Sequence, residues 1–446
     1  MARLNRGKWR WLALGLILVV LAAIATPFLG PISGFIPELS ALASKKLGQP
    51  VTIAELRLEM LPSPRVAIHG LRIGTKDEIT VGKAHIVPEL LALLGGRKMV
   101  REIRAEHVRV QERAPAMLRT IPKSEPGGEA LLIQRVVLRD VKFEHRAFKL
   151  PEFDANVELA ADLSASFASF VTRDGTLRLS VEPEGPGKAR LQLSASNWRF
   201  PLIAAPLLFE SLEVQGRVDG SQLALQSVNG RLYGGSIAGS ASLDWSRQWR
   251  VEGKADLAGV ALVPVQRALG KKNPRLSGRL GAKSTFSSTA RAPAQLLDAL
   301  VLNAPFEVAD GAWHGVDLSK AAALPMGRID PGGATRFQEL AGRFGLRGRR
   351  IKLEDLCIRS PKLVAGGYIE VAPDQTLAGK LDLSVAKTAG FIGVPVALAG
   401  TTADPSVRLT KAALIGGLIG TVLLPGIGTT LGASAGNAIE GNSGCN

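Results

Sequence analysis

The sequence predicts a mainly β protein that begins with one membrane-spanning helix. Three observations carry this prediction: an uncharged apolar run near the N-terminus, alternation of apolar and polar residues through most of the chain, and frequent turn residues, with 49 glycines and 26 prolines. Alternation is typical of strands that have one apolar face, and glycine and proline favour the turns between strands. We therefore expect many short strands joined by tight turns, with a few short helices.

The N-terminal run covers residues 11–29, in which Leu, Ile, Val and Ala predominate. A helix needs about 20 residues to cross a bilayer, so this run is long enough. Four basic residues stand directly before it, namely Arg3, Arg6, Lys8 and Arg10. No basic residue follows until Lys45. The positive-inside rule then predicts that residues 1–10 are a cytoplasmic tail and that the body is exported.

A cleaved signal peptide is the alternative interpretation of this run. Ala23-Ile24-Ala25 has the small-x-small form of a cleavage site. The apolar run is longer than the roughly 7 to 15 residues of a signal-peptide core, which favours an uncleaved anchor. Both interpretations place the body outside the cytoplasm.

Composition indicates a folded chain with a basic surface. With 46% hydrophobic and 21% charged residues, the chain lacks the signature of disorder. A formal net charge of +16 favours anionic partners such as phospholipid headgroups or nucleic acid. The exported location and an aromatic content of 5% argue against nucleic acid, because single strands are usually held on aromatic platforms.

The two cysteines, Cys357 and Cys445, exclude a disulfide framework. In an oxidising compartment they could pair and tie the C-terminal tail to the body, or they could be two unrelated thiols. Sequence spacing leaves both alternatives open, because pairing depends on geometry.

Three runs show the alternation most clearly: residues 176–182, 189–196 and 380–385. Each places its apolar side chains on one face of a strand and its polar side chains on the other. A long sheet with one apolar face must fold over, pack on another layer or hold a ligand. The candidate positions on this face are Leu177, Leu179, Val181, Leu191, Leu193, Leu381, Leu383 and Val385.

Two segments resemble copies of one unit. Residues 232–237 and 364–369 each contain a Gly-Gly pair, and each is followed by a Gly-Lys-x-Asp-Leu sequence. Since glycine readily adopts positive φ, we expect both pairs to form two-residue hairpin turns. Short helices are expected over residues 38–47, 293–301 and 412–424.

No pattern in the sequence indicates catalysis. None of the five histidines has the spacing of a helical zinc site, and no nucleophile elbow or Walker A motif is present. We therefore expect neither an enzyme nor a protein that carries a cofactor or metal. Arg347, Arg349 and Arg350 are candidates for binding an anionic headgroup, because arginine suits phosphate geometry; a solvated turn is the alternative.

The chain resembles the AsmA-like proteins of Gram-negative envelopes in several segments that occur in the same order. Residues 47–53, 61–66 and 71–74 are similar to the N-terminal unit of the family. Residues 306–318 and both Gly-Gly segments are similar to its C-terminal region, and residues 394–407 to its closing strand pair.

The resemblance implies a protein of the inner membrane, single-pass, with its N-terminus cytoplasmic and its body periplasmic. It also implies a relationship to bridge-like lipid-transfer proteins of the chorein type, whose extended antiparallel sheet curls into an apolar groove. The expected divisions are a basic tail (1–10), a transmembrane helix (11–29), the N-terminal part of the β-groove (30–270), an AsmA-like C-terminal β region (271–410) and an apolar, glycine-rich segment (411–446).

Three functions follow as hypotheses. In the first, the protein binds or conducts lipid, phospholipid above all, between inner and outer membrane, with membrane lipids and an outer-membrane or envelope protein as partners. In the second, it is a structural or assembly factor for outer-membrane proteins and carries no lipid. An envelope hydrolase ranks last, because the sequence offers no nucleophile and base. The apolar segment at residues 412–431 is either a cap on the body or a contact for a membrane or partner.

Overall fold

A computed structural model describes residues 33–61, 63–89, 99–114, 132–144, 150–160, 164–200, 207–315, 317–318, 332–361, 363–387, 390–410 and 445. Within these ranges the chain is mainly β with a few short helices, which confirms the predicted class. The described part contains no helix that is both long and apolar enough to cross a membrane. The predicted span at residues 11–29 and the predicted helix at 412–424 lie outside the described residues. The chain divides into two compact units, unit 1 (residues 1–186) and unit 2 (residues 187–446).

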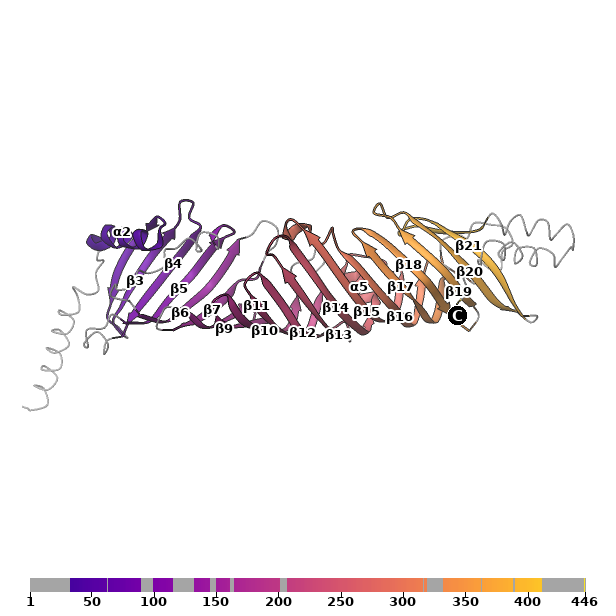
Figure 1. The fold of residues 1–446 in the computed structure, drawn as a ribbon, viewed down its shortest axis with the longest axis horizontal. Helices are drawn as coiled ribbons and strands as arrows, with labels where there is room; N and C mark the ends of the chain where they lie inside the picture. Colours follow the sequence, from indigo (N-terminus) through magenta and orange to yellow (C-terminus); the bar gives the residue numbers. More distant parts are fainter. Residues whose placement is uncertain are drawn as a thin grey trace, which may run out of the picture. The chain divides into compact units, whose positions relative to one another are not determined.

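Unit 1 starts with a short helical segment and continues as a sheet (Figure 1). Its described elements are η2 (Ser33–Phe35), α2 (Ile36–Leu47), β1 (Val51–Thr52), β2 (Glu55–Glu59), β3 (Arg65–Ile73), β4 (Ile79–Pro88), β5 (Met99–Gln111), β6 (Leu132–Glu144), β7 (Phe153–Leu159), β8 (Ala165–Thr172) and β9 (Leu177–Gly185). From β2 to β9 each strand pairs with the next, and β1 pairs with the end of β3. All of these pairings are antiparallel except β5 with β6.

Helix α2 confirms the helix predicted at residues 38–47 and begins two residues earlier. Pro37 stands in its first turn, where a missing N–H costs nothing. Gly48 ends the helix with a φ of 64°, a conformation that glycine adopts without strain. The chain then turns into β1, where the Val51 N–H donates to Ser44 Oγ at 2.9 Å.

The core of unit 1 lies on one face of its central strands. It consists of Ile79, Val81, Ala84, Ala105, Val108, Ala114 and Val141. His85, on β4, is also buried. Its Nδ1 has no hydrogen-bond partner among the described residues and lies 3.9 Å from Glu59 Oε2.

Protonation of His85 should destabilise unit 1. Burial, followed by the positive charges of Lys83 and Arg65, holds the pKa of His85 below its ordinary value of 6.5. The unfolded chain therefore binds this proton more tightly, so stability is complete above pH 6.5 and falls as the pH drops toward the lowered pKa. In the native protein, protection of the β3–β5 amides from hydrogen exchange, corrected for intrinsic rates, should fall between about pH 7 and 5. In the variant His85→Gln, most of this pH dependence should disappear. Unchanged pH dependence in the variant would contradict this assignment.

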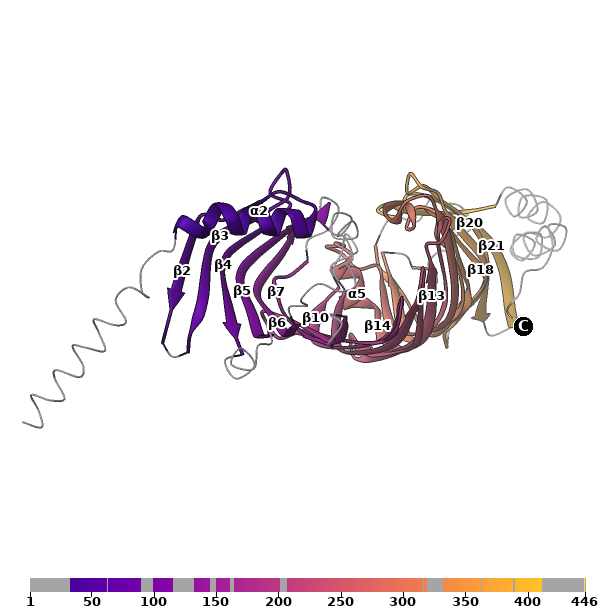
Figure 2. The ribbon, with the colours of Figure 1, turned by 60° about the vertical axis from the view of Figure 1, so that its left-hand side comes forward.

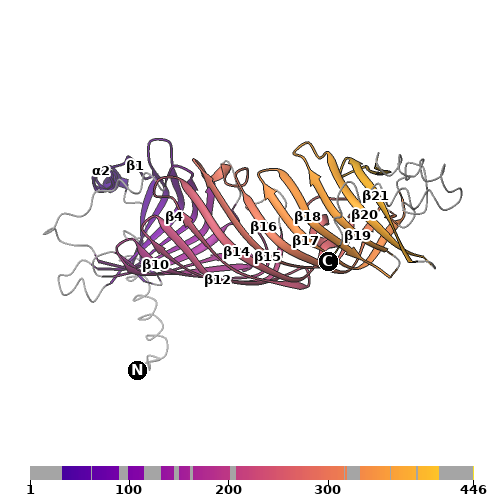
Figure 3. The same cartoon turned by 45° about the vertical axis from the view of Figure 1, so that its right-hand side comes forward.

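Unit 2 is an antiparallel sheet in which every strand pairs with the next along the chain (Figure 3). Its described elements are β10 (Lys188–Arg199), β11 (Leu208–Asp219), β12 (Gln222–Leu232), β13 (Gly235–Asp244), β14 (Trp249–Ala261), α5 (Leu262–Ala268), β15 (Leu276–Ala290), η3 (Pro293–Gln295), β16 (Val301–His314), β17 (Ala334–Arg347), β18 (Arg350–Arg359), β19 (Leu363–Val371), β20 (Leu377–Lys387), β21 (Gly390–Gly400) and β22 (Pro405–Leu409). The sheet is curved, and α5 lies on the inner side of the curve (Figure 2).

One apolar cluster, the C-terminal core, fills the inner side of β16–β22. Its buried members are Val308, Leu318, Phe337, Leu356, Ile358, Leu363, Ala365, Ile369, Leu381, Leu383, Val396, Leu398 and Val407. Leu262 of α5 packs against this cluster. The closing strand pair expected at residues 394–407 is confirmed as the antiparallel pair β21 and β22.

The helix predicted at residues 293–301 is wrong. Only η3 is helical, followed by turns, and Val301 already begins β16. The connection must return the chain antiparallel to β15, and two of its carbonyl groups bond outside the segment: Leu296 O accepts from Ser288 Oγ and Leu300 O from the Gly348 N–H. These two bonds hold the connection to the sheet instead of continuing the i→i−4 hydrogen bonds of a helix.

The two Gly-Gly pairs have different roles. A two-residue turn does join β12 and β13, but it consists of Tyr233 and Gly234, with φ of 48° and 74°, and Gly235 already begins β13. The turn predicted at Gly366-Gly367 is wrong, because both glycines lie inside β19. There the backbone of β20 approaches so closely that a Cβ at Gly367 would collide with the carbonyl oxygen of Lys380. This glycine is therefore required by close packing of strands rather than by a turn.

Cys357 and Cys445 form a disulfide bond, with their Cα atoms 5.3 Å apart. Leu356 and Ile358, on either side of Cys357, both belong to the C-terminal core. Because side chains alternate along a strand, Cys357 lies on the opposite face of β18. The disulfide thus fixes residue 445 to the face of the sheet that points away from the core.

Removing the disulfide should lower the stability of unit 2. The bond closes a loop with a sequence separation of 88, so it restricts the unfolded chain strongly. We expect the double variant Cys357→Ser, Cys445→Ser to lose about 2–4 kcal/mol in urea unfolding followed by tryptophan fluorescence. Reducing agent should lower the urea midpoint of the native protein and leave the urea midpoint of the double variant unchanged. Equal midpoints for the native and double-variant proteins would show that the bond does not stabilise the fold.

Candidate functional site

The inner face of unit 2 is a continuous apolar surface, the feature of this fold best suited to hold a ligand. Residues that pair directly in an antiparallel sheet point to the same side. The register therefore places the following half-buried side chains on one face of β10–β15: Leu191, Leu193, Val214, Leu223, Leu225, Ile237, Ala241, Val251, Leu257, Ala282 and Phe286. We call this set the open face.

The same face continues into the C-terminal core. Leu280 of β15 pairs with Val308, which belongs to the core. Farther along the sheet, Ala365 pairs with Leu383, and both are fully buried. Apolar side chains of this face are thus mostly half-buried on β10–β15, whereas many of those on β16–β22 are fully buried. The apolar surface most accessible to a ligand therefore lies on the open face.

Glycines on the inner face allow the sheet to curve. A Cβ at Gly239 would collide with the carbonyl oxygen of Lys254, and a Cβ at Gly253 would lie 2.7 Å from Ser240 O. The ring of Phe286 covers Gly253, in the position that a side chain would otherwise occupy. Small residues on the concave side let neighbouring strands approach, and an aromatic ring restores the lost packing.

Helix α5 marks the boundary between the open face and the C-terminal core. Leu262 at its start packs against the core. Gln266 ties the helix to the next strand, because its Oε1 accepts from the N–H groups of Arg275 and Leu276 and its Nε2 donates to Leu276 O. These bonds fix α5 to the start of β15.

The structure separates the predicted apolar positions into three environments. Leu177, Leu179 and Val181 lie on β9 in unit 1, half-buried and alternating with polar residues. Leu191 and Leu193 belong to the open face of unit 2. Leu381 and Leu383 are fully buried in the C-terminal core. Val385 lies in β20, and its side chain falls outside the described part.

The predicted arginines lie at the turn between β17 and β18. Arg349 donates to Asp298 Oδ1 at 3.1 Å. The side chains of Arg347 and Arg350 are exposed. The two residues pair with each other across the turn, next to the inner-face pair Leu346 and Ile351, so both lie on the outer face of the sheet at the end of their strands.

Sequence reasoning missed most of the open face. Val214, Leu225, Ile237 and Leu257 each stand between exposed neighbours in their strands. The period-two pattern that identified Leu191 was therefore present at these positions as well. It is weaker there because glycines and alanines take several inner positions.

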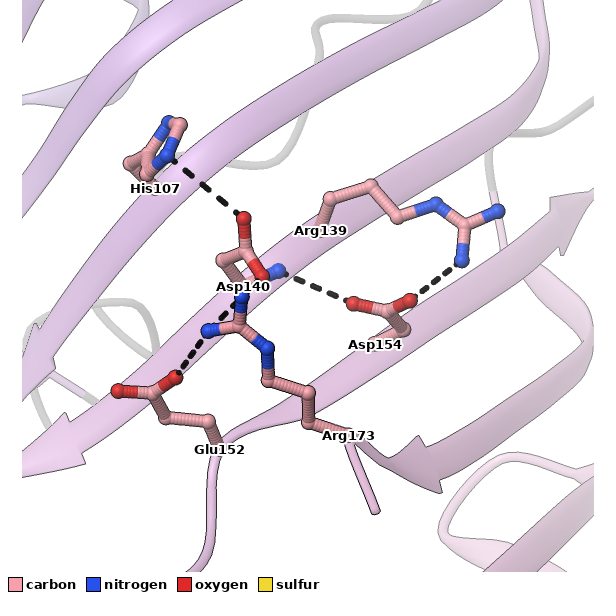
Figure 4. Close-up of polar contacts among 6 residues, drawn as sticks. All are labelled: His107, Arg139, Asp140, Glu152, Asp154 and Arg173. Atoms are coloured by element: carbon pink, nitrogen blue, oxygen red, sulfur yellow. Dashed lines mark hydrogen bonds and ion pairs between the residues drawn. The ribbon is translucent and has the colours of Figure 1, made fainter. Parts of the chain in front are cut away.

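A polar cluster on unit 1 is the second arrangement of interest (Figure 4). Arg173 donates to Glu152 at 2.9 Å and lies 3.6 Å from Asp140, and both carboxylates raise the pKa of its guanidinium. His107 Nε2 lies 3.7 Å from Asp140 Oδ2. A second pair, Arg139 with Asp154, adjoins it, and the Asp140 N–H donates to Asp154.

This cluster joins neighbouring strands of unit 1 through exposed charges. Each carboxylate has a cationic partner, and the described residues around it include no serine, threonine or cysteine in position to act as a nucleophile. Nor does the described part of the chain contain a histidine, cysteine and carboxylate group arranged to hold a metal ion. The cluster therefore acts as a set of cross-strand ion pairs, each a modest contribution at an exposed site.

The fold and a comparison with known families indicate the same class of protein. A curved antiparallel sheet with an apolar inner face defines a β-groove protein. The model of the AsmA family matches residues 172–356, from the end of β8 into β18. Over this stretch, which includes the whole open face, the chain is similar to the AsmA family. None of the curated proteins and none of the solved structures matches the chain.

Proposed function

We propose that the protein holds acyl lipid, phospholipid above all, on the open face of unit 2 and passes it between inner and outer membrane. The observation that carries the proposal is the row of half-exposed aliphatic side chains from β10 to β15, on the concave side of a curved sheet. Each methylene buried there contributes about 0.8 kcal/mol relative to water, so acyl chains are the natural occupants.

The dimensions of the open face suit an acyl chain. Neighbouring strands lie about 4.8 Å apart, so six strands extend over about 25 Å. This exceeds half the hydrocarbon core of a bilayer, which is about 30 Å thick and holds two chains end to end. Moving a chain from a bilayer to this face exchanges one apolar environment for another and needs no chemical step. Directional flow then requires an energy source outside this chain.

The proposal includes the location of the protein. Residues 11–29 anchor it in the inner membrane as a single span, residues 1–10 are cytoplasmic and the body is periplasmic. The arginine turn, through Arg347 and Arg350, binds the anionic headgroup, and an outer-membrane or envelope protein accepts the lipid. Alkaline phosphatase fused at the C-terminus should be active. An inactive fusion together with cytoplasmic reporter activity would overturn this topology.

Photo-crosslinking tests the lipid directly. A photoreactive residue at Leu191 should give lipid adducts, detected by mass spectrometry, in the full chain purified from membranes. The matched control carries the same residue at Arg190, which is exposed on the opposite face of the same strand. Equal adducts at both positions would show nonspecific contact. A folded protein without adducts at Leu191 would contradict the proposal and favour an assembly factor that carries no lipid.

A further inference from the structure

Helix α2 carries an apolar stripe on its exposed side. Phe35, directly before the helix, is 58% exposed, Leu39 is 39% exposed and Leu42 is 53% exposed. Spacings of four and three residues place them in one row along the helix. Such large apolar side chains are normally buried when they occur as a contiguous set.

The opposite side of α2 already has a packing role. Ile36, Ser40, Ala43, Ser44 and Leu47 are half-buried, also at helical spacing. This side faces unit 1, as the bond between Ser44 and β1 shows. The apolar stripe is therefore a second face, separate from the one that attaches the helix to its unit.

The charges beside the stripe are mainly basic. Lys45 is exposed in the last turn, Lys46 follows it in the sequence, and Glu38 is the one acidic residue of the helix. A helix with an apolar stripe flanked by lysines has the chemistry of helices that lie in the interface of an anionic bilayer.

The position of α2 in the chain indicates which bilayer the stripe would contact, namely the one that the predicted anchor crosses. The apolar run predicted to span the bilayer ends at Leu29, six residues before Phe35. At about 3.5 Å per residue, Phe35 cannot lie more than about 20 Å from the end of that run. A second copy of the chain is a poorer partner for the stripe, because stable protein interfaces use about 20 residues on each side and the stripe has three large apolar residues.

We propose that α2 lies in the outer surface of the bilayer that residues 11–29 cross, with Phe35, Leu39 and Leu42 inserted among the acyl chains and Lys45 at the anionic headgroups. This inference rests on the proposed anchor and is independent of lipid on the open face. The helix then fixes unit 1 at the membrane surface, where a single flexible tether would leave it free to turn.

The test uses the full chain reconstituted into vesicles of phosphatidylcholine and phosphatidylglycerol. Flotation of the vesicles first establishes that the anchor has inserted. A photoreactive residue at Leu42 should give lipid adducts, and the same residue at Ser44 should give several-fold fewer, because Ser44 lies on the side of the helix that faces unit 1. Adducts to a second copy, or none at Leu42 in floated vesicles, would overturn the proposal. Lipid adducts at Leu191 are scored separately and test only the open face.

Trypsin cleavage after Lys45 provides a second measurement. Insertion should protect this site in vesicles, and the double variant Leu39→Ser, Leu42→Ser should raise the cleavage rate about tenfold or more. The control Leu297→Ser removes a leucine that is 58% exposed in unit 2 and should leave the rate unchanged. Replacing phosphatidylglycerol by phosphatidylcholine should raise the rate about fivefold for each lysine at the surface. An unchanged rate in the double variant would contradict insertion.

Discussion

Replacing Leu225 with Asp should abolish lipid adducts at Leu191, whereas Ala224→Asp should leave them at the native level. Leu225 is half-buried on the open face, in the same row of paired residues as Leu191 and Gly216. A carboxylate there either loses its hydration when lipid binds, at a cost of several kcal/mol, or excludes the acyl chain. We therefore expect adducts to fall at least tenfold, because about 1.4 kcal/mol already corresponds to that factor.

The adjacent residue gives a close control for this experiment. Ala224 is exposed on the outer face and pairs with Arg217, so an aspartate at this position is hydrated and near a positive charge. Both variants add the same charge to the same strand, and they differ only in the face that receives it. Both should keep the free energy of unfolding within about 1 kcal/mol of the native value, because an accessible aspartate remains hydrated when lipid is absent. Equal adducts in the two variants would place the lipid elsewhere.

The strands were predictable from the sequence, because their pattern is local. Residues 189–196 alternate without interruption, and they form the middle of β10 with Leu191 and Leu193 on the inner face. Residues 177–182 of the run 176–182 and residues 380–385 likewise fall within β9 and β20. A strand with one apolar face needs only a period of two, so a short run of residues contains the whole signal.

The difference between an accessible and a buried apolar face was not predictable in this way. Leu191 and Leu383 have the same local pattern, yet the first is half-exposed and the second is fully buried. The difference depends on side chains that come from distant segments, such as Leu318 and Phe337. A hint existed in β18 and β19, where Leu356-Cys357-Ile358 and Leu363-Val364-Ala365 are continuous apolar runs, which are typical of strands covered on both faces.

Features that depend on contacts between distant residues could not be predicted from the sequence either. Cys357 and Cys445 pair because Cys445 lies beside β18, and their spacing in the sequence alone could not decide this. Gly366 and Gly367 resemble the turn glycine at Gly234, but their role depends on how closely β20 approaches β19.

The C-terminal core and the open face should respond very differently to the same deletion. Leu383→Ala removes a fully buried side chain from a packed cluster and leaves a cavity, so we expect a loss of about 2–5 kcal/mol in the free energy of unfolding. Leu193→Ala removes an equal volume from a half-exposed position, where the expected loss is about 1 kcal/mol. Urea unfolding followed by tryptophan fluorescence reports both changes, because Trp198, Trp245, Trp249 and Trp313 all lie in unit 2.

Lipid adducts should show the reverse order for these two variants. Below its unfolding midpoint, Leu383→Ala should keep native adducts at Leu191, because its side chain faces the packed core and not the space over the open face. Leu193 lies two residues from Leu191 on the same strand. Leu193→Ala should reduce the lipid adducts at Leu191 about fivefold to tenfold, since an acyl chain loses its contact with the removed carbon atoms of the leucine. If both variants lowered stability and adducts in the same proportion, the inner face would be one uniform core, and the division at α5 between a packed end and a lipid-binding end would be wrong.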